Sequence, residues 1–159
     1  MRPCLVSSLS CTRGEVDLFH DNADMLTIVP EPGFRPRCFA LVPCAGVGER
    51  AGAGGPKQYH PVAGRALVAH TLEALGAVTR LAATLVVVSP GDTLFEQQVP
   101  GFEGPRGWLA RVGGATRAET VLNGLDELLS RGAQPHDWVL VHDAARCLVQ
   151  PEWVERLIE

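Results

Sequence analysis

The sequence predicts an α/β fold in which a mostly parallel sheet carries helices on both faces. From residue 38 onward, short apolar segments rich in β-branched residues alternate with segments of helical periodicity. Such alternation builds crossover units, in which parallel strands are covered by helices. The composition agrees, because 46% of the 159 residues are hydrophobic and 20% are charged, which is ordinary for one folded domain.

Each expected strand is short, apolar and bounded by turn residues. The four segments lie at 39–42, 84–88, 109–112 and 138–142. Ligands of parallel sheets bind at the carboxyl ends of the strands, so the loops that follow these segments are the candidate site.

Three helices are expected between and after these strands. Apolar residues at helical spacing predict helices at 66–75 and 116–129. The second opens with Thr116-Arg117-Ala118-Glu119, which is the pattern of a capping box. Pro151 favours the start of the third, because proline is common at the first helical position.

The first part of the chain has a different character. Residues 1–36 hold Ser/Cys-rich and acidic stretches and then several prolines, without sustained periodicity. They are expected to be a disordered extension or the product of an early start codon, whereas residues 37–159 form the folded domain.

Charge and cysteine content exclude several classes of function. A net charge of −4 argues against a general nucleic-acid-binding surface. No apolar run approaches the ~20 residues that span a bilayer. The five cysteines form no C-x-x-C pair and no cluster with zinc spacing, so they suit reduced thiols in the cytoplasm. We therefore expect a cytoplasmic protein without nucleic-acid or membrane partners.

The loop after the first strand is typical of a phosphate site. It reads Pro43-Cys44-Ala45-Gly46-Val47-Gly48-Glu49-Arg50 and is followed by Lys57. Backbone N–H groups and two cations can surround a phosphate chain. The alternative is a surface loop with solvated cations. Cys44 could also be a nucleophile, but no nearby His or Asn would activate it.

Two better-known glycine motifs fit this loop poorly. Gly46 to Ala51 matches the dinucleotide fingerprint, but the next strand begins about 40 residues after the first, and glycines with Pro56 would break the required helix. A P-loop needs Gly-Lys-Ser/Thr, whereas Lys57 stands between Pro56 and Gln58. A flexible loop that folds over a triphosphate remains.

The other two loops carry further candidates. The N–H groups of Gly113-Gly114 could read a base edge or a ribose hydroxyl, with Thr120 adding a hydroxyl, or the segment is an ordinary turn. Asp143 leaves the last strand where it could hold Mg²⁺ beside phosphate oxygens, or it caps a turn. Arg146 could pair with phosphate or with an acidic group that props the loop, and the second is expected.

Taken together with Pro56-Lys57-Gln58-Tyr59 and Ser89-Pro90-Gly91-Asp92, these loops match one family in order and spacing. Over residues 38–159 the chain resembles the 2-C-methyl-D-erythritol 4-phosphate cytidylyltransferases. The resemblance implies a Rossmann-like nucleotidyltransferase fold. It also implies transfer of CMP from CTP to 2-C-methyl-D-erythritol 4-phosphate, with Mg²⁺ and release of pyrophosphate, in non-mevalonate isoprenoid biosynthesis.

The resemblance also implies roles for individual residues. Arg50 and Lys57 correspond to cations that stabilise the transition state, and Asp143 corresponds to a metal ligand. The positions expected to bind the nucleotide are Pro43, Cys44, Ala45, Gly46, Gly48, Gly114 and Thr120.

The chain departs from the family in three respects. Cys147 stands where the family usually has proline, and Ala115 replaces an acidic residue. The family continues well beyond Glu159, so we expect the C-terminal part of the fold, with most sugar-phosphate contacts and the dimer arm, to be missing. A homodimer is expected of the full-length family only. Two alternatives stay open, namely a pentitol-phosphate (ribitol 5-phosphate) cytidylyltransferase and a non-catalytic nucleotide-binding fragment.

Overall fold

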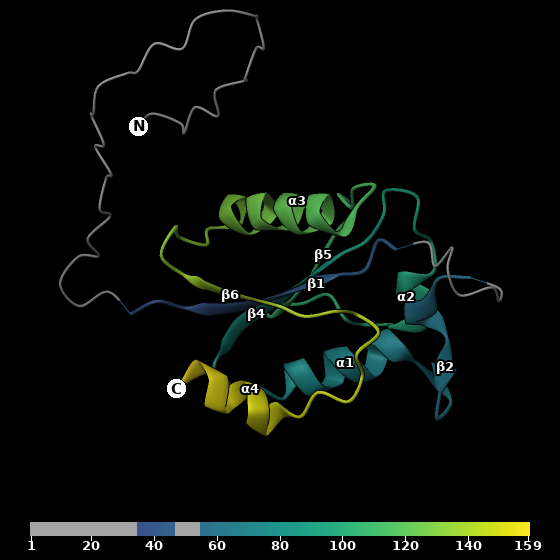
Figure 1. The fold of residues 1–159 in the computed structure, drawn as a ribbon, viewed down its shortest axis with the longest axis horizontal. Coiled ribbons are helices and arrows are strands. Elements are labelled where there is room, and N and C mark those ends of the chain that lie inside the picture. Colours follow the sequence, from purple (N-terminus) through teal and green to yellow (C-terminus); the bar gives the residue numbers. More distant parts are fainter. Residues whose placement is uncertain (1–34, 47–54) are drawn as a thin grey trace, which may run out of the picture.

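The computed structural model describes residues 35–46 and 55–159. Its main sheet has four parallel strands in the order β5-β4-β1-β6. The strands are β1 (Cys38–Pro43), β4 (Leu81–Val87), β5 (Gly107–Ala110) and β6 (Trp138–Val141). Helix α3 (Arg117–Ser130) lies on one face, and α1 (Leu67–Gly76) and α4 (Pro151–Ile158) lie on the other (Figure 1). The predicted α/β architecture is confirmed.

Alternation along β1 divides the core into two clusters. Ala40 and Val42 belong to the cluster that includes α1 and α4, whereas Phe39 and Leu41 belong to the cluster that includes α3. All four side chains are at most 1% exposed, as expected of a central strand covered on both faces. Gly124 brings α3 close to the sheet, because a Cβ there would lie 2.6 Å from the Leu41 Cδ1 atom.

The helix boundaries follow the local signals in the sequence. Thr116 caps α3, with its hydroxyl accepting from the Glu119 N–H at 3.1 Å. The Glu119 carboxylate accepts in return from the Thr116 N–H at 3.0 Å, so the predicted capping box is present. Helix α4 begins at Pro151, also as predicted.

Pairing between strands moves some of the predicted boundaries. β4 starts at Leu81, earlier than expected, and β5 ends at Ala110 rather than at 112. The β5 ladder runs only from Gly107, opposite Thr84, to Ala110, opposite Val87. Apolar content alone does not report where a partner strand ends.

Three short elements were not expected from the sequence. They are the 3₁₀ turn η1 (Lys57–Tyr59), the hairpin of β2 (Pro61–Val62) with β3 (Arg65–Ala66), and α2 (Phe95–Gln98). All lie in segments without sustained periodicity. The hairpin turn places both Ala63 and Gly64 at positive φ.

The start of β1 is tied to the start of β6. The Arg37 guanidinium donates to Asp137 Oδ2 at 2.7 Å, and the Asp137 side chain is only 1% exposed. Residues 1–34 of the predicted extension lie outside the described residues. Within 35–46 and 55–159, no helix is long and apolar enough to cross a membrane.

Candidate functional site

The three candidate loops meet around one cavity of about 650 Å³ at the carboxyl ends of the strands. This is the edge of the sheet where the sequence places a ligand. Eight of the predicted site residues line the cavity: Pro43, Cys44, Ala45, Gly46, Lys57, Gly114, Thr120 and Asp143. The other two, Gly48 and Arg50, lie outside the described residues.

Gln58 holds the first loop in place through its side chain. Its buried side-chain amide donates to the backbone oxygens of Cys44, at 3.0 Å, and of Gly46, at 2.9 Å. Because Gln58 follows Lys57 in the single turn η1, the same bonds hold the lysine next to the loop. Gln58 was not among the predicted site residues, although it stands in the Pro56-Lys57-Gln58-Tyr59 motif.

Tyr59 anchors the lysine turn on its other side. Its hydroxyl donates to Asp92 Oδ2 at 2.7 Å. Asp92 Oδ1 accepts from the N–H groups of Leu94 and Phe95 at 2.9 and 3.0 Å, so one carboxylate joins the turn to the start of α2. Neither Tyr59 nor Asp92 was predicted to have a role, because a contact across 33 residues leaves no local pattern.

Cys44 is a buried residue that lines the cavity. It is 2% exposed, and burial raises the pKa of its thiol to about 12. The thiol therefore stays protonated at neutral pH and does not supply a thiolate. The alternative that Cys44 is a nucleophile gains no support from its surroundings.

The paired glycines of the second loop allow neighbouring backbone segments to pack closely against it. A Cβ on Gly113 would lie 2.3 Å from Ala45 Cβ and 2.7 Å from the Val88 carbonyl oxygen. A Cβ on Gly114 would lie 2.4 Å from Glu119 Cβ. Neither position has space for a side chain. Gly113 allows the second loop to lie against the first, and Gly114 allows the second loop to pack against Glu119 of α3.

The N–H groups of these glycines are bonded within the protein. The Gly113 N–H donates to the Val88 carbonyl at 2.9 Å, and the Gly114 N–H donates to Thr120 Oγ1 at 3.1 Å. The Thr120 hydroxyl in turn donates to the Thr116 carbonyl at 2.9 Å. Thr120 is 2% exposed. Here Thr120 shapes the turn, and the cavity wall formed by Gly114 is backbone.

Asp143 lies in the third loop between two arginines. Its Oδ1 atom accepts from Nε of Arg117 at 2.9 Å, and its Oδ2 atom pairs with Nε of Arg146 at 2.9 Å. Burial would raise the pKa of this carboxyl, but the Arg117 hydrogen bond and both arginine charges outweigh it and hold the pKa below its usual value. The predicted pairing of Arg146 with an acidic group is confirmed.

The donor set suits a metal that is held largely by its substrate. Among the described residues, no three His, Cys, Asp or Glu side chains form a group that could hold a metal ion. Mg²⁺ is commonly bound through one or two carboxylates plus substrate phosphates. Asp143, in a cavity that also contains Lys57 and the N-terminal turn of α3, fits that pattern.

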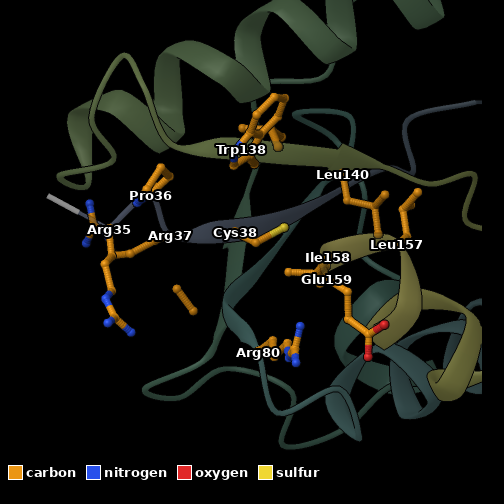
Figure 2. Close-up of a pocket in the computed structure, with 12 residues that line it drawn as sticks. Arg35, Pro36, Arg37, Cys38, Arg80, Trp138, Leu140, Leu157, Ile158 and Glu159 are labelled. Atoms are coloured by element: carbon orange, nitrogen blue, oxygen red, sulfur yellow. The ribbon is translucent and has the colours of Figure 1, made fainter. Parts of the chain in front are cut away.

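A second cavity, of about 960 Å³, lies toward the amino ends of the strands. Figure 2 shows Leu140 of β6 and Leu157 of α4 beside it, together with Cys38 at the start of β1 and Arg80. It contains none of the predicted site residues. Its position, at the edge away from the three loops, does not match where ligands of parallel sheets bind.

Comparison with known proteins agrees with the family resemblance that the three loops carry. The family model described as 2-C-methyl-D-erythritol 4-phosphate cytidylyltransferase matches residues 38–159. The chain is 54% identical over 137 residues to a bifunctional IspD/IspF enzyme of Albidiferax ferrireducens, covering 86% of this chain and 32% of the relative. It is 52% identical over 123 residues to a 2-C-methyl-D-erythritol 4-phosphate cytidylyltransferase of Burkholderia cenocepacia, covering 77% of this chain and 51% of the relative.

A solved structure shares the fold. A crystal structure of 4-diphosphocytidyl-2C-methyl-D-erythritol synthase matches with a TM-score of 0.67 and 38% identity, covering 79% of this chain and 54% of that one. The chain thus spans about half the length, or less, of the curated relatives it matches.

Proposed function

Because the chain belongs to the 2-C-methyl-D-erythritol 4-phosphate cytidylyltransferase family, we propose that its carboxyl-edge cavity binds CTP for transfer of CMP to that alcohol phosphate. One observation carries the proposal. Lys57, Asp143 and the glycine turns come from separate loops, yet they line a single cavity. Such a combination of cation, carboxylate and tightly packed backbone suits a nucleoside triphosphate.

The chemistry requires positioning more than proton transfer. A phosphate oxygen of the alcohol phosphate attacks the α-phosphorus of CTP, and the bond to the bridging oxygen breaks to release pyrophosphate. The attacking oxygen is already ionised at neutral pH, so no general base is needed. Catalysis then consists of aligning two anions and offsetting their repulsion.

We assign that offset to cations of this chain. Lys57, fixed by its neighbours Gln58 and Tyr59, lines the cavity and would lie beside the phosphates. Arg50 is proposed for the same role from its place in the first loop. Asp143 would hold Mg²⁺, which when bound neutralises charge on the phosphate oxygens.

The nucleotide contacts are proposed for both sides of the cavity. Pro43, Cys44, Ala45 and Gly46, continued by Gly48, would face the phosphates. Gly114 and Thr120 would face the cytidine through the backbone that they shape. The scattered cysteines suit a cytoplasmic location, which we also propose. For full-length members of the family we propose a homodimer.

Pyrophosphate release tests this function directly. The chain is incubated with CTP, Mg²⁺ and either 2-C-methyl-D-erythritol 4-phosphate or ribitol 5-phosphate, and CTP binding is measured by calorimetry in parallel. We expect pyrophosphate release when the acceptor is 2-C-methyl-D-erythritol 4-phosphate and none when it is ribitol 5-phosphate. Release with ribitol phosphate alone would contradict the assigned acceptor. CTP binding without pyrophosphate release in the presence of either acceptor would favour a non-catalytic nucleotide-binding fragment.

A further inference from the structure

We propose that Arg117 covers the oxygen of Asp143 that a metal would use, and that a nucleotide phosphate draws Arg117 away. The metal site would therefore open only when the triphosphate arrives. The inference rests on the proposed CTP site and adds a role for Arg117, a residue that the sequence motifs left without one.

The two arginines engage Asp143 unequally. Arg117 directs both Nε and Nη2 at Oδ1, each at 2.9 Å, whereas Arg146 reaches Oδ2 through Nε at 2.9 Å. Arg117 and Asp143 line the cavity, but Arg146 is not part of its wall. Release of Arg117 would therefore free Oδ1 inside the cavity while Arg146 still holds the carboxylate in place.

The charge of the cavity favours an anion before a cation. Among the described residues that line it, Lys57 and Arg117 are positive and Asp143 is negative, which leaves a net positive charge. Arg117 is also the first residue of α3, a helix of 14 residues whose N-terminal dipole attracts negative charge. A divalent cation alone meets repulsion and a carboxylate oxygen that is already paired.

The exchange is energetically easy. The Arg117 side chain is 61% exposed and that of Asp143 is 34% exposed, so their ion pair is screened by solvent and contributes little to stability. A guanidinium forms strong, often bidentate, hydrogen bonds to phosphate. Arg117 would thus exchange a weak partner for a more highly charged one.

Metal binding without nucleotide tests the cover on Asp143. Mn²⁺ serves as the probe, and its free concentration is followed by electron paramagnetic resonance. We expect weak binding to the wild type and about fivefold tighter binding to Arg117→Gln, the change that corresponds to loss of one exposed ion pair. In Arg117→Gln combined with Asp143→Asn, the gain should vanish.

Lys57→Gln is the matched control. It removes the same charge from the same cavity, but the described structure gives Lys57 no ion pair with Asp143. A clearly smaller gain in this variant supports the cover. An equal gain in Lys57→Gln, no gain in Arg117→Gln, or a gain that survives Asp143→Asn would overturn it.

The second half of the proposal is tested with CTP in EDTA. Arg117→Gln should weaken metal-free CTP binding about fivefold. Arg65→Gln, which breaks an exposed ion pair with Glu73 elsewhere, should leave it unchanged. Equal affinities for wild type and Arg117→Gln would refute the exchange. If even the wild type binds no CTP, the proposed function fails, and the Mn²⁺ comparison still decides the cover on Asp143.

Discussion

Gly113→Ala should separate the first two loops of the site. The added Cβ would lie 2.3 Å from Ala45 Cβ and 2.7 Å from the Val88 carbonyl oxygen. Carbon atoms normally approach to about 3.5–4.0 Å, so the backbone would have to move by about 1 Å or more. Neither contact lies at the end of a flexible side chain, so no rotamer change relieves the overlap.

The size of the effect follows from this overlap. Overfilling a packed site typically costs about 1–3 kcal/mol, and for a chain of this length each kcal/mol lowers Tm by about 2–4 °C. We therefore expect a loss of roughly 2–12 °C. Because Ala45 lines the proposed CTP cavity, CTP affinity should fall as well.

The assay is thermal unfolding combined with calorimetric titration of CTP. Gly104→Ala is the control, since a Cβ there has no atom within 4 Å and the backbone is not left-handed. The control should keep both the Tm and the CTP affinity of the wild type. If Gly113→Ala behaved like Gly104→Ala in both measurements, the close approach of the loops would not matter to the site.

Three further substitutions test separate parts of the structure. Lys57→Ala should lower kcat about 100-fold, equivalent to ~3 kcal/mol, with a much smaller change in CTP affinity; steady-state kinetics showing equal losses would refute its role. Tyr59→Phe removes the 2.7 Å bond to Asp92 and should lower the free energy of unfolding by about 1–2 kcal/mol in urea titrations, whereas an unchanged midpoint would mean that this bond does not anchor the turn. Burial raises the pKa of the Asp137 carboxyl, but hydrogen bonds from Gln134 and Arg37 outweigh it and hold the pKa below its usual value. Asp137→Asn should therefore lower the free energy of unfolding by about 2 kcal/mol near neutral pH. The stability that Asp137 contributes is present above its unfolded pKa of about 3.9 and is lost as pH falls through the folded pKa, so a difference that persisted unchanged at the most acidic pH would contradict this linkage.

Local chemistry made much of the fold predictable. The central strands β1 and β4 are almost entirely apolar because helices cover both faces of the sheet there, and the Thr116 capping box marks the start of α3 within a residue. Strand ends were less predictable, as β5 shows. Where β5 stops depends on its pairing with β4, which no property of residues 107–112 records.

The candidate site divides in the same way. Glycines and charged residues at strand ends identified the cavity, because the carboxyl ends of parallel strands share one edge. The supports of those residues could not be found locally. Tyr59 reaches Asp92 across 33 residues, and Arg117 reaches Asp143 across 26 residues. Contacts at such separations depend on the assembled sheet, and neither end has a composition that predicts the other.

Hydrogen–deuterium exchange with and without CTP and Mg²⁺ tests the central claim most directly, because it asks which cavity holds the nucleotide. We predict slower exchange in residues 43–46, 113–120 and 142–146, which belong to the three loops at the carboxyl edge. The start of β6 and the end of α4, beside the cavity in Figure 2, should exchange as in the free protein. Protection confined to that second cavity, or no protection in the three loops at saturating CTP, would contradict the assignment.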